Sequence, residues 1–349
     1  MKKRIATILA MSIFTGAMAG CGSQGSTAAK VEEPEKEEVA VEEKEAAADG
    51  MYGDKTILGQ SSWVGYAPLY LADKMGFFDA HGADVDVQYF ESKTDSKSAL
   101  AAGRIQGMST TVDTHVMSAA SGMNLSVILA LDDSYGGDGV SAKSEIKDIP
   151  SLAGHTVALD TSGGASYFWF QYLLKQNDMT LDDVQVVNMS SGDAGAAFVA
   201  GEVDAAVTWE PWLSKAKETD NGSVLVDSTA TPGVIVDALA MDSNFAKEYP
   251  GTCKAIVEGW YDALAYIETS PDEAYKIMME YTGDETVDAL KGSMSEVSFY
   301  DEEKNKSYFG GEIQDIATMA ANLWVEMKLI DASPAIDKLI DGEYIEGLE

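Results

Sequence analysis

Cysteine is almost absent from this chain of 349 residues, which contains only Cys21 and Cys253. If Cys21 is modified, a single thiol remains and no internal disulfide can form. The pattern around Cys253 is helical, so a packed side chain is expected there rather than a nucleophile. The fold must therefore depend on a large apolar core, and a hydrophobic content of 46% is enough to build one.

Histidine and the common catalytic motifs are also scarce. The three histidines, His81, His115 and His155, show no metal-ligand spacing and no nucleophile signature. The glycine-rich segments 136–139 and 163–166 match neither a P-loop, a dinucleotide fingerprint nor a nucleophile elbow. We therefore expect a protein that is not an enzyme and has no metal and no cofactor. Whether His115 touches a ligand stays undecided at this point.

Positive charge is low, and the formal net charge is -34 with a sequence pI near 4.2. Such a surface repels nucleic acid and anionic lipid, so neither is an expected partner. Part of the negative charge lies in residues 31–49, which are rich in Glu and lack aromatic residues. Because this segment has little apolar surface to bury, residues 21–54 are predicted to form an acidic, disordered tether.

Long apolar runs are limited to the N-terminus. Basic residues at positions 2–4 precede the apolar run Ile5–Ala19, which is too short to cross a bilayer as a helix. Residues 1–20 therefore read as a signal peptide. Met18-Ala19-Gly20-Cys21 resembles a lipobox, in which Cys21 would carry lipid such as palmitate. The expected location is the outer face of the cell membrane, with the lipid as the only membrane contact; the alternative is ordinary secretion with a chance cysteine.

From Lys55 onward, short apolar runs alternate with helical patterns, which indicates α/β sheets with largely parallel strands. The predicted strands include Thr56–Leu58, Val85–Tyr89, Leu125–Leu131, Thr156–Leu159, Val184–Asn188 and Ala205–Thr208. The predicted helices between them include Pro68–Lys74, Ser96–Ala102, Val112–Ser121, Tyr167–Gln176 and Ala194–Ala200. After about Asp242 the pattern predicts helices alone, at Asp242–Tyr249, Thr252–Thr269, Pro271–Tyr281 and Glu312–Met327.

An internal similarity relates Ala99–Thr110 to Ala197–Thr208, with Gly103 aligned to Gly201. Each copy reads as a helix, a glycine turn, a short buried strand, and polar or aromatic residues at the carboxyl end of that strand. Ligands of open α/β sheets bind at such ends, so two of them are expected to face each other across a cleft. Coincidence between two common βα units is the alternative.

Four segments at strand ends carry the candidate ligand contacts. Two of them combine aromatic rings with hydroxyl groups or an acid. A third supplies a hydroxyl and an acid after the first strand of the internal similarity. The fourth has glycines at the start of a helix. Free backbone N–H groups at such a helix start attract negatively charged groups. The candidates are Ser62, Trp63, Tyr66, Thr111, Asp113, Ser162, Gly164, Ser166, Tyr167, Trp209 and Glu210. Trp212 is expected to pack in the core or between lobes, and its contact with ligand is undecided.

These segments resemble the nitrate/sulfonate/taurine-type periplasmic binding proteins, a family that includes binders of thiamine-pyrimidine precursors. The similarity runs from about Lys55 to Tyr281 and is carried by Gly65–Leu69 through Lys74–Phe78, Ala197–Gly201, Ala205–Trp212 and Pro232-Gly233. It implies an α/β, two-lobed, type II-like fold, with a mixed sheet flanked by helices in each lobe and the C-terminal helices on the first lobe. The first lobe would hold residues 55–133 and 242–349. The second would hold residues 134–241, with hinge strands at its ends and Asp237 as a further cleft residue.

The resemblance also implies a function, namely a monomeric, extracytoplasmic substrate-binding lipoprotein that passes a small solute to the permease and ATPase subunits of an ABC importer. A solute of the nitrate, sulfonate or taurine type is the first expectation. Arg104, the only arginine after the leader, lies in a turn far from the predicted cleft, so it cannot clamp an oxyanion there.

The other candidates for the solute and the function stay open. Aromatic residues beside Asp113, Glu210 and Asp237 suit a cationic or nitrogen-ring solute, such as a thiamine-pyrimidine precursor or an amine. An extracytoplasmic enzyme or a sensor on the same scaffold is the alternative of another class.

Overall fold

The computed structural model describes residues 50–61, 63–90, 93–283 and 286–346. The predicted signal peptide, the lipidation site Cys21, nearly all of the acidic tether and the candidate Ser62 lie outside the described residues. Within the described residues, none of the helices combines the length and the apolar character that a membrane span requires.

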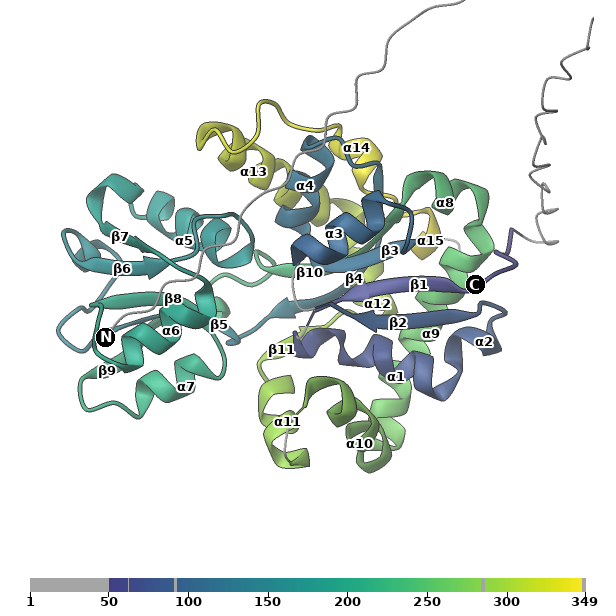
Figure 1. The fold of residues 1–349 in the computed structure, drawn as a ribbon, viewed down its shortest axis with the longest axis horizontal. Helices are drawn as coiled ribbons and strands as arrows, with labels where there is room; N and C mark the ends of the chain where they lie inside the picture. Colours follow the sequence, from purple (N-terminus) through teal and green to yellow (C-terminus); the bar gives the residue numbers. More distant parts are fainter. Residues whose placement is uncertain (1–49, 62, 91–92, 284–285, 347–349) are drawn as a thin grey trace, which may run out of the picture. The chain divides into compact units, whose positions relative to one another are not determined.

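Eleven strands of the described chain form two mixed sheets (Figure 1). The six-stranded sheet has the order β11 (Val297–Phe299), β4 (Leu125–Ser134), β10 (Val236–Asp242), β3 (Gly107–Thr111), β1 (Thr56–Gln60) and β2 (Val85–Tyr89). The five-stranded sheet has the order β7 (Gln185–Asn188), β6 (Thr156–Leu159), β8 (Ala205–Trp209), β5 (Asp138–Lys143) and β9 (Gly222–Asp227).

The two sheets share one arrangement. The orders β2-β1-β3-β10-β4 and β7-β6-β8-β5-β9 both begin with three parallel strands, followed by a fourth strand that is antiparallel to its neighbours. In the chain, the fourth strand of each sheet follows the fifth strand of the other, since β5 comes after β4 and β10 comes after β9. The chain therefore passes twice between the sheets, through residues 135–137 and 228–235.

The internal similarity corresponds to this repeated arrangement. Its two copies end in β3 and β8, the third strands of their sheets. Gly103 and Gly201, in the turns before these strands, have φ angles of 68° and 77°. Both glycines are therefore left-handed, a conformation that a side chain would strain.

Helices cover both faces of each sheet. In the first part of the chain they are α1 (Ala67–Met75), α2 (Phe77–Ala80), α3 (Lys93–Ala101), α4 (Val112–Ala120), α5 (Ala165–Gln176), α6 (Ser191–Val199) and α7 (Trp212–Lys217). Figure 1 shows α3 and α4 on one side of the six-stranded sheet and α1 and α2 on the other. This alternation follows from right-handed connections, because the chain reverses direction across the sheet after β2.

The C-terminal part adds α8 (Ser243–Glu248), α9 (Pro250–Thr269), α10 (Pro271–Thr282), α11 (Val287–Met294), α12 (Glu302–Ser307), α13 (Ile313–Glu326), α14 (Ile336–Leu339) and α15 (Glu343–Glu346). As predicted, these helices pack on the six-stranded sheet and its helices. The prediction of helices alone was wrong, because β11 pairs with β4 at the sheet edge. A strand of three residues is too short to show an alternating pattern in the sequence.

The core of the six-stranded sheet lies around β4, which is buried along its whole length. Three tryptophans are completely buried, and each indole N–H has a partner. Trp169 donates to Thr231 Oγ1 at 2.7 Å, Trp260 to the Tyr300 carbonyl at 2.9 Å, and Trp324 to the Asp113 carbonyl at 3.0 Å. The indole N–H groups of these three buried tryptophans are therefore all hydrogen-bonded.

Candidate functional site

The first candidate edge lies where β1, β3 and β4 end and β10 begins. In the strand register, Thr111 on β3 pairs with Asp237 on β10, and Asp237 pairs with Asp132 on β4. All three residues are buried. Strand pairing thus places two acids and a hydroxyl side by side, although they are far apart in the sequence.

Two aromatic residues of the segment after β1 are bonded to these acids. The indole Nε1 of Trp63 donates to Asp132 Oδ1 at 2.9 Å, and the hydroxyl of Tyr66 donates to Asp237 Oδ1. Gly65 lies between them, and a Cβ there would come within 2.0 Å of Asp132 Oδ2. The hydroxyl of Tyr281, at the end of α10, donates to the Ser61 carbonyl. The segment is therefore held closely against the edge of the sheet.

The carboxyl groups of Asp132 and Asp133, at the end of β4, have few hydrogen-bond donors to compensate for their burial. Asp132 is completely buried, and its Oδ2 has no hydrogen-bond partner among the described residues. Burial raises the pKa of Asp132 well above its usual range, and the carboxylates of Asp237, Asp133 and Asp138 add to this effect. Burial also raises the pKa of Asp133 to about 7, although the Gly233 N–H donates to its Oδ2 at 2.8 Å.

The second candidate edge lies where β6 and β8 end, and it is rich in hydrogen-bond donors. The Oγ of Ser191 donates to Ser166 Oγ at 3.0 Å, and Thr208 Oγ1 donates to the Ser191 carbonyl at 2.7 Å. Gly163 and Gly164 have φ angles of 101° and 98° and lead into α5. Within the described chain, α5 starts without a side-chain cap. Its first-turn N–H groups therefore suit a polar or negatively charged group.

A bridging segment, Tyr135–Asp138, connects the two edges. The Gly137 carbonyl accepts a hydrogen bond from the Glu210 N–H at 2.9 Å, and a Cβ on Gly137 would lie 2.9 Å from Cη2 of Trp63. Asp138 pairs with Trp209 in the strand register. Gly137 is therefore bordered by Trp63 from the first edge and by the end of β8 from the second.

The predicted candidates fall into two groups. Trp63, Tyr66, Thr111 and Asp237 meet at the first edge, and Ser162, Gly164, Ser166 and Trp209 lie at the second. Trp209 is 38% exposed, which is unusual for a tryptophan at a strand end. The exposed Ser162 donates from its Oγ to Asp160 Oδ1 at 2.6 Å.

Several other candidates have structural contacts. Tyr167 is buried and stacks on Trp324 with ring centroids 6.1 Å apart. Glu210 accepts hydrogen bonds from the N–H and Oγ of Ser214, both at 3.0 Å, and so stabilises the first turn of α7. Asp113 is buried in the first turn of α4.

Two residues that the sequence left undecided also have structural contacts. His115 is completely buried, and its Nε2 lies 3.0 Å from the Ala238 carbonyl. Trp212 packs against Gly195 of α6.

The sequence predictions missed the acids Asp132 and Asp133 and the aromatic residues Tyr89 and Tyr135. The large apolar side chains that are exposed in the described chain are Tyr89, Tyr135, Trp209, Val325 and Leu329. Tyr89 and Trp209 end β2 and β8, and Tyr135 directly follows β4. Two adjacent acids at the end of a buried strand were a signal that could have identified Asp132 and Asp133.

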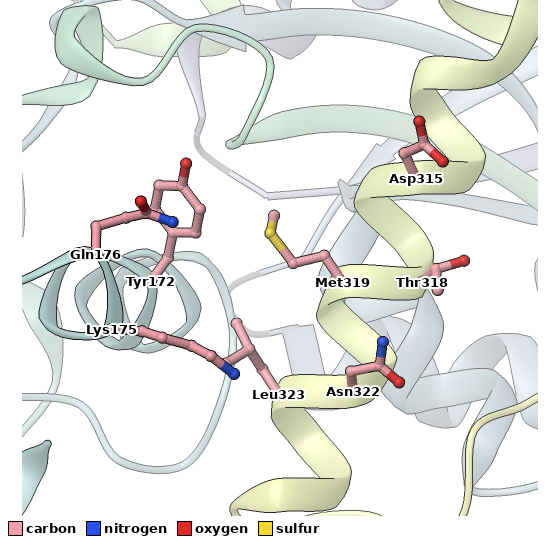
Figure 2. Close-up of a pocket in the computed structure, with 8 residues that line it drawn as sticks. All are labelled: Tyr172, Lys175, Gln176, Asp315, Thr318, Met319, Asn322 and Leu323. Atoms are coloured by element: carbon pink, nitrogen blue, oxygen red, sulfur yellow. The ribbon is translucent and has the colours of Figure 1, made fainter. Parts of the chain in front are cut away.

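A separate cavity of about 360 Å³ lies between α5 and α13 (Figure 2). Its lining residues are Tyr172, Lys175, Gln176, Asp315, Thr318, Met319, Asn322 and Leu323. Lys175 is engaged in an ion pair with Glu326 at 2.8 Å. None of the candidate residues at the two strand edges lines this cavity, so it is distinct from the site described above.

Residues 54–281 match the NMT1-like family, which covers more than half of the chain. The chain belongs to the NMT1-like family. A Bacillus subtilis (strain 168) protein named as an aliphatic sulfonates-binding protein is 22% identical over 286 residues, which are 80% of this chain and 84% of that protein. The taurine-binding periplasmic protein of Escherichia coli (strain K12) is 26% identical over 199 residues, 56% of this chain and 61% of the relative.

Solved structures show the same fold. The periplasmic aliphatic sulphonate binding protein SsuA from Escherichia coli matches with a TM-score of 0.70 at 19% identity, covering 83% of this chain and 98% of SsuA. The desulfurization enzyme DSZB matches with a TM-score of 0.60 at 15% identity, covering 84% of this chain and 98% of the enzyme. The predicted periplasmic-binding-protein fold is therefore confirmed, and this fold hosts both binding proteins and an enzyme.

Proposed function

We propose that this member of the NMT1-like family captures one small solute between the two strand edges and delivers it to an ABC importer. The observation that carries this proposal is the presence of two equivalent sheets joined by residues 135–137, since ligands of open α/β sheets bind at the carboxyl ends of the strands. Lobes of residues 55–133 with 242–349, and of 134–241, would close on the solute by bending at the two crossings. The Oγ atoms of Ser134 and Ser228 lie 2.9 Å apart and couple these crossings.

The proposal includes export and a lipid anchor at Cys21. It is supported by the basic start of the chain, the short apolar run and the lipobox-like residues 18–21. The names of the sulfonate-binding and taurine-binding relatives support an extracytoplasmic binding role. The proposal also includes that the protein is a monomer and that its partners are the permease and ATPase subunits of the importer.

Binding without turnover is proposed because neither the described cysteine nor His115 is exposed at the edges. The described cysteine, Cys253, is buried in α9, and burial raises the pKa of its thiol well above the usual range. His115 is enclosed in the core. The strand edges supply hydrogen-bond donors, acids and aromatic faces, which are groups that hold a solute.

A thermal-shift screen of sulfonates, amines and pyrimidines tests the proposal. A solute at 100 times its Kd should stabilise the protein by about 2.7 kcal/mol, and calorimetry of the hits should give one site per monomer. The recovered solute should be chemically unchanged. The absence of any stabilising compound, or the appearance of a product, would count against solute capture.

Replacement of Trp209 is expected to weaken binding of the identified solute. Trp209→Ala removes an exposed ring from the second edge and should raise the Kd more than about tenfold, with little change in the free energy of unfolding. Leu329→Ala is the matched control, because Leu329 is also 38% exposed but follows α13. Equal Kd values for the two variants and the unmodified protein would move the site away from β8.

A further inference from the structure

The charge balance of the first edge indicates the charge of the solute. Asp132 is completely buried, its Oδ1 accepts the indole hydrogen bond of Trp63, and its Oδ2 is left without a partner among the described residues. A buried carboxylate that is only half compensated is costly unless a proton or a positive charge neutralises it. The next residue, Asp133, also has a buried oxygen without a described partner, Oδ1.

The charged neighbours of Asp132 do not supply the missing charge, and Lys304 offsets the burial of Asp133 only in part. The carboxylates of Asp237, Asp133 and Asp138 face Asp132, and the hydroxyl of Tyr66, bonded to Asp237, also interacts with Asp132. Lys304 and Glu312 face Asp133 from the C-terminal part. Lys304 already donates to Ser298 Oγ at 2.9 Å and to the Phe299 carbonyl at 3.0 Å.

The indole ring of Trp63 connects the acids of the first edge to the bridging segment. The Trp63 ring is bonded through its N–H to Asp132, and a hydrogen bond to a carboxylate makes an aromatic face more electron-rich. The tip of this ring reaches Gly137, which is bonded to the residue after Trp209. Tyr135, 49% exposed, lies in the same bridging segment. Electron-rich rings backed by carboxylates attract organic cations.

A metal ion is a poorer fit than an organic cation. Throughout the described ranges, no group of three or more His, Cys, Asp and Glu residues is placed to hold a metal ion. Asp132 also contacts the indole N–H edge of Trp63 and the Cα of Gly65, which offer no oxygen ligands to a metal ion.

We propose that the solute carries a positively charged nitrogen, which the rings of Trp63 and Trp209 hold in front of Asp132 and Asp237. This inference rests on the proposed function and adds the charge of the solute to it. Asp132 acts through Trp63 and is therefore a positioning residue. The donors at the start of α5 remain available for a second, polar end of the same solute.

The sign of the pH dependence distinguishes this solute from a simple anion. Burial favours the protonated form of Asp132 and Asp133 in the free protein. A bound cation favours the ionised form, so its binding releases protons and its affinity rises as the pH rises through about 7, the pKa of Asp133. A bound anion without a positive charge favours the protonated form, so its binding takes up protons and its affinity falls as the pH rises through the same value.

Two pairs of matched probes test the proposal by calorimetry on the full chain. Choline is compared with its uncharged isostere 3,3-dimethyl-1-butanol, and taurine with ethanesulfonate, which lacks the ammonium group. At least one ammonium compound should bind about tenfold more tightly than its partner. Titrations in buffers of different ionisation enthalpy should show proton release. Asp132→Asn should abolish most of this preference and the proton release, whereas Asp204→Asn, the same substitution at the opposite end of the other sheet, should retain both.

Three results would overturn the inference. The first is an equal or higher affinity for the probes without nitrogen, and the second is proton uptake on binding. The third is an absence of binding by both ammonium probes at about 10 mM. These results leave solute capture intact if the thermal-shift screen finds another ligand, whereas a screen without any ligand would count against the proposed function itself.

Discussion

Asp204 and Asp132 are two acids of this protein in opposite environments. Asp204 lies directly before β8, at the amino end of the five-stranded sheet. It is bonded to Lys143 Nζ at 2.5 Å, to the Thr156 N–H at 3.0 Å and to Thr156 Oγ1 at 2.8 Å. These donors hold the pKa of Asp204 well below its usual range. Asp132, at the carboxyl end of β4, has one indole donor and acidic neighbours, and its pKa is raised.

The difference is that Asp204 stabilises the fold, whereas the buried charge of Asp132 is not neutralised by the fold. The donors of Asp204 are supplied by β5 and β6 themselves, so its charge is neutralised within the folded chain. The charge of Asp132 has no such compensation, and the positive nitrogen proposed for the solute would supply it. Replacing Asp204 should therefore lower the stability and leave binding unchanged. Replacing Asp132 should weaken binding without lowering the stability.

The largest expected effect is the loss of stability in Asp204→Ala. The substitution removes the Lys143 ion pair and leaves the donors of Thr156 without their acceptor, so the free energy of unfolding should fall by about 2 kcal/mol. Urea denaturation measures this change. Asp132→Asn is the matched variant and should leave stability unchanged or raise it by about 1 kcal/mol. A larger loss for Asp132→Asn than for Asp204→Ala would invert the comparison.

The pH dependence of stability is the second expected effect. An acid with a raised pKa binds its proton more tightly when folded, so the stability due to Asp133 is lost as the pH rises from about 4 to 7. The slope for one such proton is about 1.4 kcal/mol for each pH unit. The pH dependence due to Asp204 has the opposite sign, because its pKa is lowered by folding. The stability that it contributes is lost only as the pH falls below about 4. Denaturation curves of Asp133→Asn should show a flatter slope between pH 4 and 7, and an unchanged slope would contradict the assignment.

The smallest expected effect concerns Glu296, whose carboxyl group faces that of Glu210. Burial and the Glu210 carboxylate raise the pKa of Glu296 to about 7. Glu296→Gln should therefore stabilise the protein at pH 8 by about 0.5 kcal/mol, a small value because the pair is partly exposed and screened. At pH 5 the variant should match the unmodified protein, since Glu296 is then protonated. Equal stabilisation at both pH values would exclude repulsion between the two carboxylates as the cause.

Much of the fold could be predicted because local sequence patterns determine its strands and helices. The alternation of apolar runs and helical segments predicted the two α/β sheets, and the repeated helix–glycine–strand unit predicted equivalent strands, observed as β3 and β8. Trp63, Tyr66 and Trp209 could be proposed because each lies next to a strand end in the sequence. The short strand β11 gave no such pattern.

The contacts of the acidic part of the candidate site, and the acids Asp132 and Asp133, were not predicted in the same way. The Trp63–Asp132 bond joins residues 69 positions apart, and Tyr66 and Asp237 are 171 apart. Their contacts depend on strand register and on the antiparallel position of β10, which the sequence pattern did not reveal. The stacking of Tyr167 on Trp324 joins residues far apart in the sequence, so no local pattern could reveal it. That Tyr167 and Glu210 contact the solute stays a prediction.

Hydrogen exchange with and without the solute found by the thermal-shift screen tests the central claim most directly, because it locates the bound solute. We predict that the solute slows exchange at residues 63–66, 111–115, 135–138 and 164–168, and leaves the strand starts around Asp204 unchanged. Protection confined to α5 and α13 at Tyr172, Gln176 and Met319, around the cavity of Figure 2, would contradict a solute site at the two strand edges.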